Sequence, residues 1–196
     1  TFANEISQKI VEEDFNTDIK NVFTEFNEPI AAASIAQVHT GKIDDNQKVA
    51  IKILRPKIEE KFRDDFKFFY FVSGLLEKLN PNLMRLKFTE SIQTMERSVK
   101  MEMDLRFEAA AISEINNNMT DEDEYIIPKI FWEKTTRKIL TIEWIDGISI
   151  RDRDSLKKRG FDLKNLARII IQSFLNQALR NGFFHADMHQ GNLLIN

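Results

Sequence analysis

The chain of 196 residues contains no cysteine, only six glycines and four prolines, and no long apolar run. Without cysteine it forms neither disulfides nor thiolate metal sites, which fits a reducing compartment. The apolar stretch FFYFVSGLL is too short, and too closely flanked by charges, to span a bilayer. The first 18 residues are rich in acids and do not predict a signal peptide.

The charge balance excludes another class of protein. The chain has 28 basic and 31 acidic side chains, a net charge of −3, and so offers no general attraction for nucleic acid. Apolar residues make up 42% and charged residues 30%, which is a globular composition. The length is sufficient for one core or two small lobes.

The N-terminal third predicts a helix followed by strands. Apolar residues spaced among charges predict a helical segment over residues 1–26, which the sequence FNEP ends, because the residue before Pro29 is disfavoured in a helix. Residues 30–39 and 48–54 have the composition of two strands, joined by a turn in GKIDDNQ.

The rest of the chain predicts helices around a second strand pair. Residues 57–79 and 88–115 predict two long helices, and residues 125–133 and 138–147 predict two strands. A strong helix pattern then precedes Gly182, its expected C-terminal cap. The order predicts an α+β protein with a small sheet-bearing lobe and a helical lobe.

The first motif is AAASIAQV. Ala31, Ala33, Ala36 and Val38 occupy the four defined positions of G-x-G-x-x-G-x-V, the pattern of a loop that covers phosphates. Alanine permits a close approach but lacks the freedom of glycine at positive φ. Plain packing of an alanine run is the alternative interpretation.

The second motif is VAIK, the alternating pattern of a buried strand that ends in Lys52 on the expected inward face. A lysine in that position needs an anion, unless it extends to the surface. Fourteen positions separate it from Val38, enough for one hairpin. Lys52 would then reach phosphates beneath the alanine loop.

The third motif, EMDLRFEAA, places Glu102, Asp104 and Glu108 on one predicted helix. Glu108 is a candidate partner for Lys52, as in the lysine–glutamate pair of kinases. Glu102 and Asp104 lie about 200° apart around a helix, so a solvated acidic face is the alternative for them.

The fourth motif is HADMHQGN, between the last helix and a strand-like triplet at residues 193–195. His185, Asp187 and Asn192 match H-x-D-x-x-x-x-N, in which the aspartate accepts or orients a proton and the asparagine holds Mg²⁺. A zinc site at His185 and His189, or a polar turn, are the alternatives.

Together these motifs resemble the UbiB family of atypical kinases, the aarF-domain-containing kinases that act in ubiquinone biosynthesis. The resemblance rests on AAASIAQVH, VAIKILRP, the pair Glu102 and Asp104, and HADMHQGN, and covers the chain from about residue 28. It implies a bilobal protein-kinase-like fold that binds ATP and Mg²⁺. The implied segments are a helical lead-in (1–27), an N-lobe with inserted helices (28–146) and a partial C-lobe (147–196).

The resemblance also implies a role for each matching residue. Lys52 would bind the α- and β-phosphates and pair with Glu108, Asp187 would be the catalytic aspartate, and Asn192 would bind Mg²⁺. Glu102 and Asp104 would be regulatory and face an inhibitory lysine-x-glycine-glutamine segment. Nucleotide contacts are implied for Ala31, Ala32, Ala33, Ser34, Val38, Ala50, Ile142 (the gatekeeper), Glu143 and Ile145.

The sequence departs from the family pattern at several positions. Gln190 replaces proline, Leu54 replaces glutamine, and Ala36 replaces glycine. Neither the lysine-x-glycine-glutamine segment nor D-F-G occurs, so we expect a fragment with an incomplete active site.

Two other functions remain open at this point. One is a small-molecule phosphotransferase of the aminoglycoside or choline kinase type, and the other is a pseudokinase scaffold that binds isoprenoid lipid. The expected partners are nucleotide, isoprenoid lipid or quinone-biosynthesis proteins, and a membrane surface, with no nucleic acid. The expected location is the bacterial cytoplasm at the inner membrane, or alternatively the matrix side of the mitochondrial inner membrane.

Overall fold

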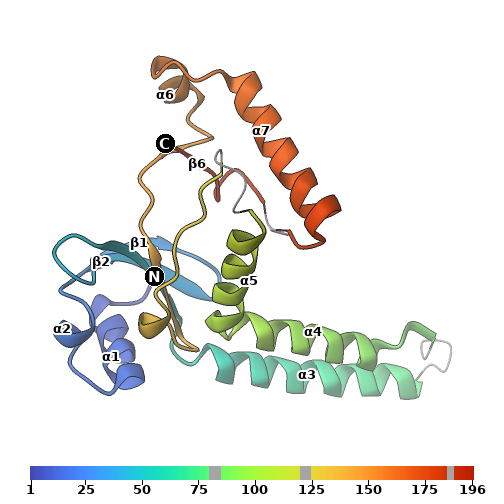
Figure 1. Cartoon of the computed structure of the whole chain (residues 1–196). Helices are drawn as coiled ribbons and strands as arrows, with labels where there is room; N and C mark the ends of the chain where they lie inside the picture. Colours follow the sequence, from blue (N-terminus) through green and yellow to red (C-terminus); the bar gives the residue numbers. More distant parts are fainter. Residues whose placement is uncertain (80–84, 120–124, 185–187) are drawn as a thin grey trace. The chain divides into compact units, whose positions relative to one another are not determined.

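The computed structural model of the chain describes residues 1–79, 85–119, 125–184 and 188–196 (Figure 1). These residues form two compact units. The first contains Thr1–Glu108 and Phe131–Thr141, and the second contains Ala109–Ile130 and Ile142–Asn196. Helices and strands are combined throughout, so the expected α+β class is confirmed. The segment boundaries expected after residues 27 and 146 stay predictions.

A four-stranded sheet in the order β1-β2-β3-β4 organises the first unit. Its strands are β1 (Glu25–Ala32), β2 (Ala36–Lys42), β3 (Lys48–Leu54) and β4 (Ile139–Glu143). β2 pairs in antiparallel fashion with both β1 and β3. The strand expected over residues 48–54 is therefore confirmed.

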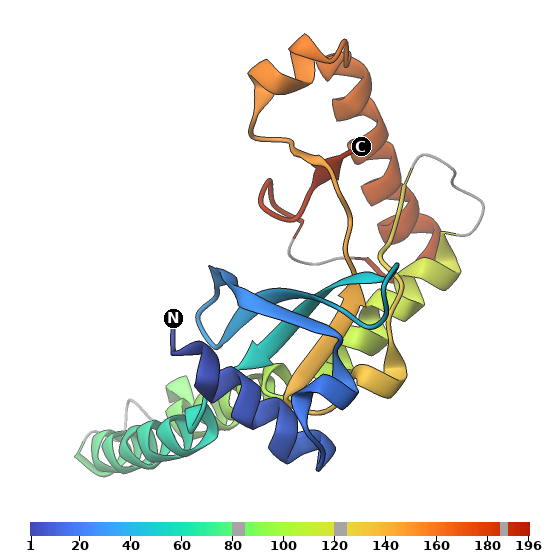
Figure 2. The same cartoon turned by 90° about the vertical axis from the view of Figure 1, so that its left-hand side faces the viewer.

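The apolar core of the first unit lies between this sheet and the helices α1 (Asn4–Phe15) and α2 (Ile19–Val22) (Figure 2). Helix α1 ends where Asn16 adopts a left-handed conformation with a φ of 52°, a common way to end a helix. Asp18 caps α2 by accepting a hydrogen bond from the Lys20 N–H. The buried members of the core are Val11, Val22, Phe23, Val49, Ile51, Ile53, Phe131 and Ile139.

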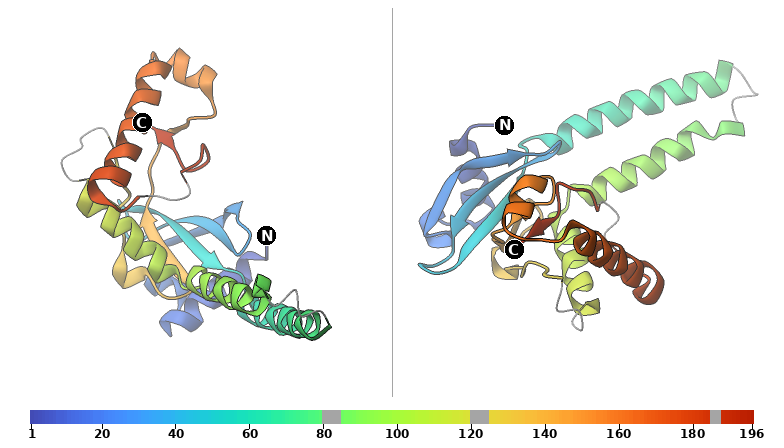
Figure 3. Two further views of the ribbon diagram at one scale, coloured as in Figure 1. Left: turned by 90° about the vertical axis from the view of Figure 1, so that its right-hand side faces the viewer. Right: turned by 90° about the horizontal axis from the view of Figure 1, so that it is seen from above.

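Two long helices, α3 (Ile58–Leu79) and α4 (Phe88–Glu102), lie side by side (Figure 3). The Tyr70 hydroxyl on α3 donates a 2.7 Å hydrogen bond to the Glu96 carboxylate on α4. Large apolar side chains on α3 remain exposed instead of packing between the helices. None of the helices within the described ranges is long and apolar enough to cross a membrane.

The second unit contains α6 (Arg153–Lys158), α7 (Leu163–Leu175) and a short antiparallel pair, β5 (Ile148–Ser149) with β6 (Leu194–Ile195). A Cβ atom at Gly147 would lie 2.9 Å from the Leu194 Cβ, so glycine permits the close approach of this pair. Helix α7 continues as a π-helical turn over Asn176–Asn181. The turn ends at Gly182, whose φ of 69° confirms the expected cap.

The expected helix over residues 1–26 is wrong in its last part, because Phe26 belongs to β1. Pro29 also lies within β1 and does not simply end a helix. The strand tolerates proline because it is at the edge of the sheet and its register shifts on both sides of Pro29. The single strand expected over residues 30–39 is two strands, separated by the turn at residues 33–35.

The single helix expected over residues 88–115 is also wrong, because it divides into α4 and α5 (Leu105–Asn118). The Asp104 carboxylate accepts a hydrogen bond from the Arg106 N–H and so begins a new helix. The strand expected over residues 125–133 is limited to one bridge, Ile130 to Ile142, followed by a 3-10 turn (Trp132–Lys134). Short apolar runs do not by themselves distinguish these structures.

Candidate active site

Lys52 and Glu108 form an ion pair in the first unit. The Lys52 Nζ lies 2.9 Å from Oε1 and 2.7 Å from Oε2 of Glu108. The two side chains are 27% and 42% exposed, so this pair is partly withdrawn from water. This is the pairing that the sequence predicts, and it joins strand β3 to helix α5.

The register of the sheet determines which side chains accompany Lys52. Val38 lies directly opposite Lys52, and Thr40 lies opposite Ala50. Because opposite residues share a face, Val38, Ala50 and Lys52 are on the same face. Ile51 and Ile53 occupy the other face and belong to the core. The strand pattern predicts that Lys52 is on the inward face. In the structure Lys52 instead lies on the face opposite the apolar core.

Contacts at the start of α5 position Glu108. The buried residue Leu105 donates its backbone N–H to the Arg137 carbonyl at 2.9 Å. One turn of helix later, Glu108 projects toward Lys52. The turn that precedes β4 thus holds the helix whose glutamate forms the ion pair.

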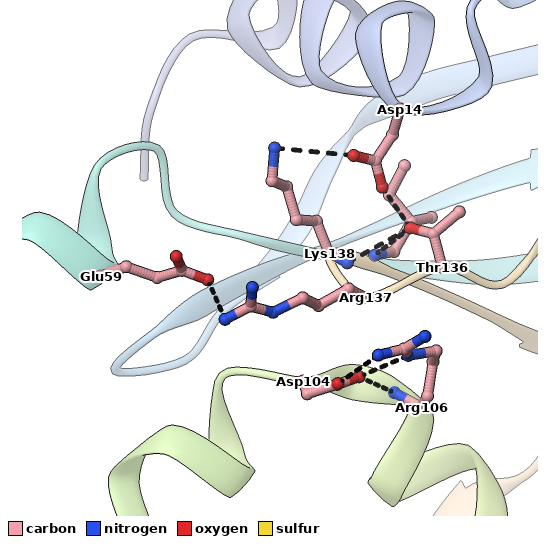
Figure 4. Close-up of polar contacts among 8 residues, drawn as sticks. Asp14, Glu59, Asp104, Arg106, Thr136, Arg137 and Lys138 are labelled. Carbon is pink, nitrogen blue, oxygen red and sulfur yellow. Dashed lines mark hydrogen bonds and ion pairs between the residues drawn. The ribbon is translucent and has the colours of Figure 1, made fainter. Parts of the chain in front are cut away.

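That turn, Thr136–Lys138, also contacts two other helices (Figure 4). The Thr136 hydroxyl donates to Asp14 of α1, and Lys138 lies 3.5 Å from the same carboxylate. Arg137 forms a 2.7 Å ion pair with Glu59 at the start of α3. One short turn therefore connects α1, α3 and α5, a role that no motif in the sequence indicates.

The prediction that Glu102, Asp104 and Glu108 share one helix is wrong. Glu102 ends α4, and Asp104 lies between α4 and α5. Arg106 holds the Asp104 carboxylate through its Nε at 2.9 Å and its Nη2 at 2.7 Å (Figure 4). This hydrogen bonding, more than the charge of nearby Arg137, lowers the pKa of Asp104 below its usual range. In this arrangement Asp104 pairs with Arg106.

The alanine loop connects β1 to β2. Ala31 and Ala32 end β1, and Ala36 begins β2. The Ala33 N–H donates to the Ala36 carbonyl at 2.9 Å, which closes the turn. The non-glycine residues with positive φ in the described ranges are Asn16, Lys57 and Lys87, so the loop needs no left-handed residue. Alanine therefore replaces glycine here without backbone strain.

Arg55 holds this loop from the end of β3, a contact that the sequence motifs do not predict. Its Nη2 donates to the Ala33 carbonyl and its Nε to the Ser34 carbonyl, each at 2.9 Å. Its backbone N–H donates to the Ile35 carbonyl at 2.8 Å. An arginine directly after the lysine strand, in VAIKILRP, is the signal that could have indicated it.

The expected adenine-contacting residues lie at or beyond the end of β4. Ile142 is bridged to Ile130. The Glu143 N–H donates to the Lys129 carbonyl at 2.8 Å, and the Glu143 side chain accepts a hydrogen bond from the Lys129 N–H. The Glu143 N–H is thus already used, while Ile145 follows where the strand has ended.

The expected metal ligand Asn192 lies in a tight turn before β6. Its N–H donates to the His189 carbonyl at 3.0 Å, and the Gly191 N–H donates to the His189 Nδ1 at 2.9 Å. A Cβ atom at Gly191 would lie 2.7 Å from the His189 ring, so glycine permits this contact. His185 and Asp187 lie outside the described residues.

The predicted site residues thus fall into two groups. Those in the first unit, which also contains the Lys52–Glu108 pair, are Ala31, Ala32, Ala33, Ser34, Val38 and Ala50. Ile142, Glu143, Ile145 and Asn192 belong to the second unit.

An antiparallel sheet whose third strand carries a lysine paired with a helical glutamate is the arrangement of kinase-like folds. The structure of Rv3197 from Mycobacterium tuberculosis, solved in complex with erythromycin, has the same fold, with a TM-score of 0.76. It is 24% identical to this chain, and the match covers 98% of this chain and 48% of that one.

The family model of the ABC1 atypical kinase-like domain matches residues 1–196, and the chain belongs to this family. It is 37% identical over 200 residues to "Probable protein kinase UbiB" of Histophilus somni (strain 129Pt), which covers 100% of this chain and 37% of the relative. It is 37% identical over 195 residues to the protein of the same name from Marinobacter nauticus, with 99% and 36% covered. The chain thus spans little more than a third of these relatives. The expected family is confirmed.

Proposed function

We propose that the protein is a Mg²⁺-dependent, ATP-binding kinase-like ATPase that supports isoprenoid-quinone biosynthesis. The observation that carries the proposal is the Lys52–Glu108 ion pair, on the sheet face that Lys52 shares with Val38 and Ala50. The alanine loop leads directly into β2, the strand that contains Val38. A lysine held in this way presents its charge to phosphate oxygens. The name UbiB, which the bacterial relatives carry, supports the quinone-biosynthesis part of the proposal.

Each remaining residue has a role in this proposal. Lys52 binds the α- and β-phosphates, and Glu108 orients it. Asp187 accepts or orients the proton of the attacking hydroxyl or water. Ile142 limits the adenine pocket, which Glu143 and Ile145 line with backbone groups.

Magnesium fits the chemistry of Asn192. Its side chain provides the amide oxygen that Mg²⁺ accepts as a ligand, and the turn that contains it is held by the His189 carbonyl. When bound, the ion neutralises charge that develops on the phosphates. In the sequence, Asp187 precedes Asn192 by five positions.

Calorimetric titration of Mg²⁺-ATP into the natural full-length protein tests the proposal. We expect saturable binding that weakens about tenfold or more in Lys52→Ala, equivalent to about 1.4 kcal/mol. Lys67→Ala is the matched control, because Lys67 forms an exposed ion pair with Asp64 on α3. Absence of binding at millimolar nucleotide would refute the ATP site.

Hydrolysis of ATP tests the role of Asp187. We expect Asp187→Asn to lower turnover by at least about a hundredfold, because the side chain then loses its capacity to accept a proton. Binding of Mg²⁺-ATP should persist in this variant. Turnover equal to that of the wild type would remove Asp187 from the mechanism.

A lipid-binding scaffold is the second candidate, favoured by one observation on α3. Phe68, Phe71 and Leu79 are 62%, 68% and 72% exposed, an unusual display of large apolar side chains. We propose isoprenoid lipid or quinone-biosynthesis proteins as partners, at the cytoplasmic face of the bacterial inner membrane. Co-sedimentation of Phe68→Ser/Phe71→Ser with lipid vesicles tests this, since unchanged sedimentation would exclude the α3 face.

A further inference from the structure

Arg55 bonds three consecutive carbonyl groups of the alanine loop. Its guanidinium donates to Ala33 and Ser34, and its backbone N–H donates to Ile35. The guanidinium is planar, with donors in a fixed fork, so two bonds from one side chain set the orientation of two peptide groups. No other side chain in the described ranges bonds the carbonyls of these three residues.

The orientation of those carbonyls determines where the loop N–H groups point. In a trans peptide the carbonyl and the N–H of the next residue point in opposite directions, and the described residues have no cis peptide. When the carbonyls of Ala33 and Ser34 point toward Arg55, the N–H groups of Ser34 and Ile35 point away from it. Across the described part of the chain, neither of these N–H groups donates a hydrogen bond.

The loop therefore presents two adjacent backbone donors without acceptors among the described residues, on the hairpin that carries Lys52. Ala33 cannot add a third, because its N–H is used by the Ala36 carbonyl. Successive backbone N–H groups that point the same way form a binding site for an anion such as phosphate. Two positions further along β2 from Ala36, Val38 lies opposite Lys52, whose ammonium attracts the same kind of ligand.

We propose that Arg55 is a positioning residue that orients the N–H groups of Ser34 and Ile35 toward the terminal phosphates of a nucleoside triphosphate. The assignment rests on the proposed nucleotide site and adds to it the origin of phosphate selectivity in a loop without glycine. Alanine narrows the backbone conformations of the loop, and Arg55 selects one of them. Arg55 itself contacts the loop and not the ligand.

The experiment compares ATP with adenosine, both titrated calorimetrically into the full-length protein. Loss of the two guanidinium bonds in Arg55→Gln should weaken ATP binding about tenfold and leave adenosine binding unchanged, because adenosine has no phosphate. Arg55→Lys restores one donor and should lie between Arg55→Gln and the wild type. Arg63→Gln on the exposed surface of α3 is the control and should change neither affinity.

A second measurement monitors the loop directly. Amide hydrogen exchange at Ala33 should accelerate at least about tenfold in Arg55→Gln, while exchange at Ile51 in the neighbouring strand stays as in the wild type. An equal loss of ATP and adenosine affinity, or no loss of either, would overturn the assignment of Arg55. If the wild type binds no ATP, the proposed function itself fails, and the assignment fails with it.

Discussion

The ammonium nitrogen of Lys52 contacts both carboxylate oxygens of Glu108, at 2.9 and 2.7 Å, although 56 positions separate the two residues in the chain. Strand β3 and helix α5 are thereby joined by one charged contact. Because both side chains are partly withdrawn from water, either one alone would leave a poorly solvated charge.

The strength of this ion pair is the first prediction. A double-mutant cycle with Lys52→Met and Glu108→Gln, followed by urea denaturation, should give a coupling free energy of about 1 kcal/mol. The exposed pair Lys67–Asp64, at 69% and 66% exposure, should give about 0.3 kcal/mol or less. Equal coupling in the two pairs would mean that the withdrawal of Lys52 from water has no energetic effect.

The second prediction concerns pH and His39, which is fully buried on β2. Burial lowers the pKa of His39, only partly opposed by its hydrogen bond to the Asn27 carbonyl and the charge of Glu28. In the neutral ring, Nδ1 donates to Asn27 at 2.8 Å and Nε2 accepts from Gln37 at 3.0 Å. Protonation of Nε2 would place its N–H against the Gln37 Nε2, which is also a donor, so this hydrogen bond would be lost.

The sign of the effect follows from this lowered pKa. Below the ordinary histidine pKa of about 6.5, the unfolded chain binds a proton that the folded chain excludes. The free energy of unfolding should therefore fall as pH decreases from about 6.5 to the folded pKa, by at most about 1.4 kcal/mol per pH unit. His39→Gln should abolish this slope, and His189→Gln should retain it. A wild-type slope that disappears with His189→Gln would contradict the assignment.

The third prediction compares two glycines. A Cβ atom at Gly41 on β2 would overlap the Glu25 carbonyl oxygen and lie 2.9 Å from the Ile51 Cδ1. Gly41→Ala should lower the free energy of unfolding by about 2 kcal/mol or more, because backbone and core must move. Gly74 lies within α3, and apart from the backbone of that helix no atom of the described residues lies within 4 Å of the position that a Cβ would take. Gly74→Ala should therefore raise stability by up to about 1 kcal/mol. Chemical denaturation measures both effects, and changes of the same sign would refute the prediction.

The fourth prediction concerns Asp104 and Arg106. The hydrogen bonds from Arg106 lower the pKa of Asp104, so their contribution to stability is present above the ordinary aspartate pKa and is lost as pH falls through the folded value. Arg106→Gln should raise the pKa of Asp104 toward its ordinary value, measured by NMR titration of the carboxyl carbon. The control is Lys42→Gln, which removes the partner of Glu25 and should leave Asp104 unchanged. An unchanged titration in Arg106→Gln would assign the lowered pKa to another group.

The residues that carry the candidate site could be found in the sequence because their chemistry is local. The strand at residues 48–54, with lysine at position 52, and the long helix from residue 57 have periodic patterns that the structure confirms. The Lys52–Glu108 pairing was also predicted, but only by analogy with the kinase pattern. The helix boundary at Asp104 and the β1–β2 turn depend on a few specific hydrogen bonds, which periodicity does not reveal.

Composition and short motifs were enough to predict the α+β class and the family, because helix and strand patterns and motifs are local properties of the chain. The remaining features depend on tertiary contacts. Lys52 lies on the face opposite the apolar core because the register of β2 and β3 gives the other face to Ile51 and Ile53. Arg55 bonds the loop, and Thr136–Lys138 joins three helices, because folding brings polar groups that are distant in the chain within hydrogen-bonding distance. Such contacts have no periodic pattern in the chain.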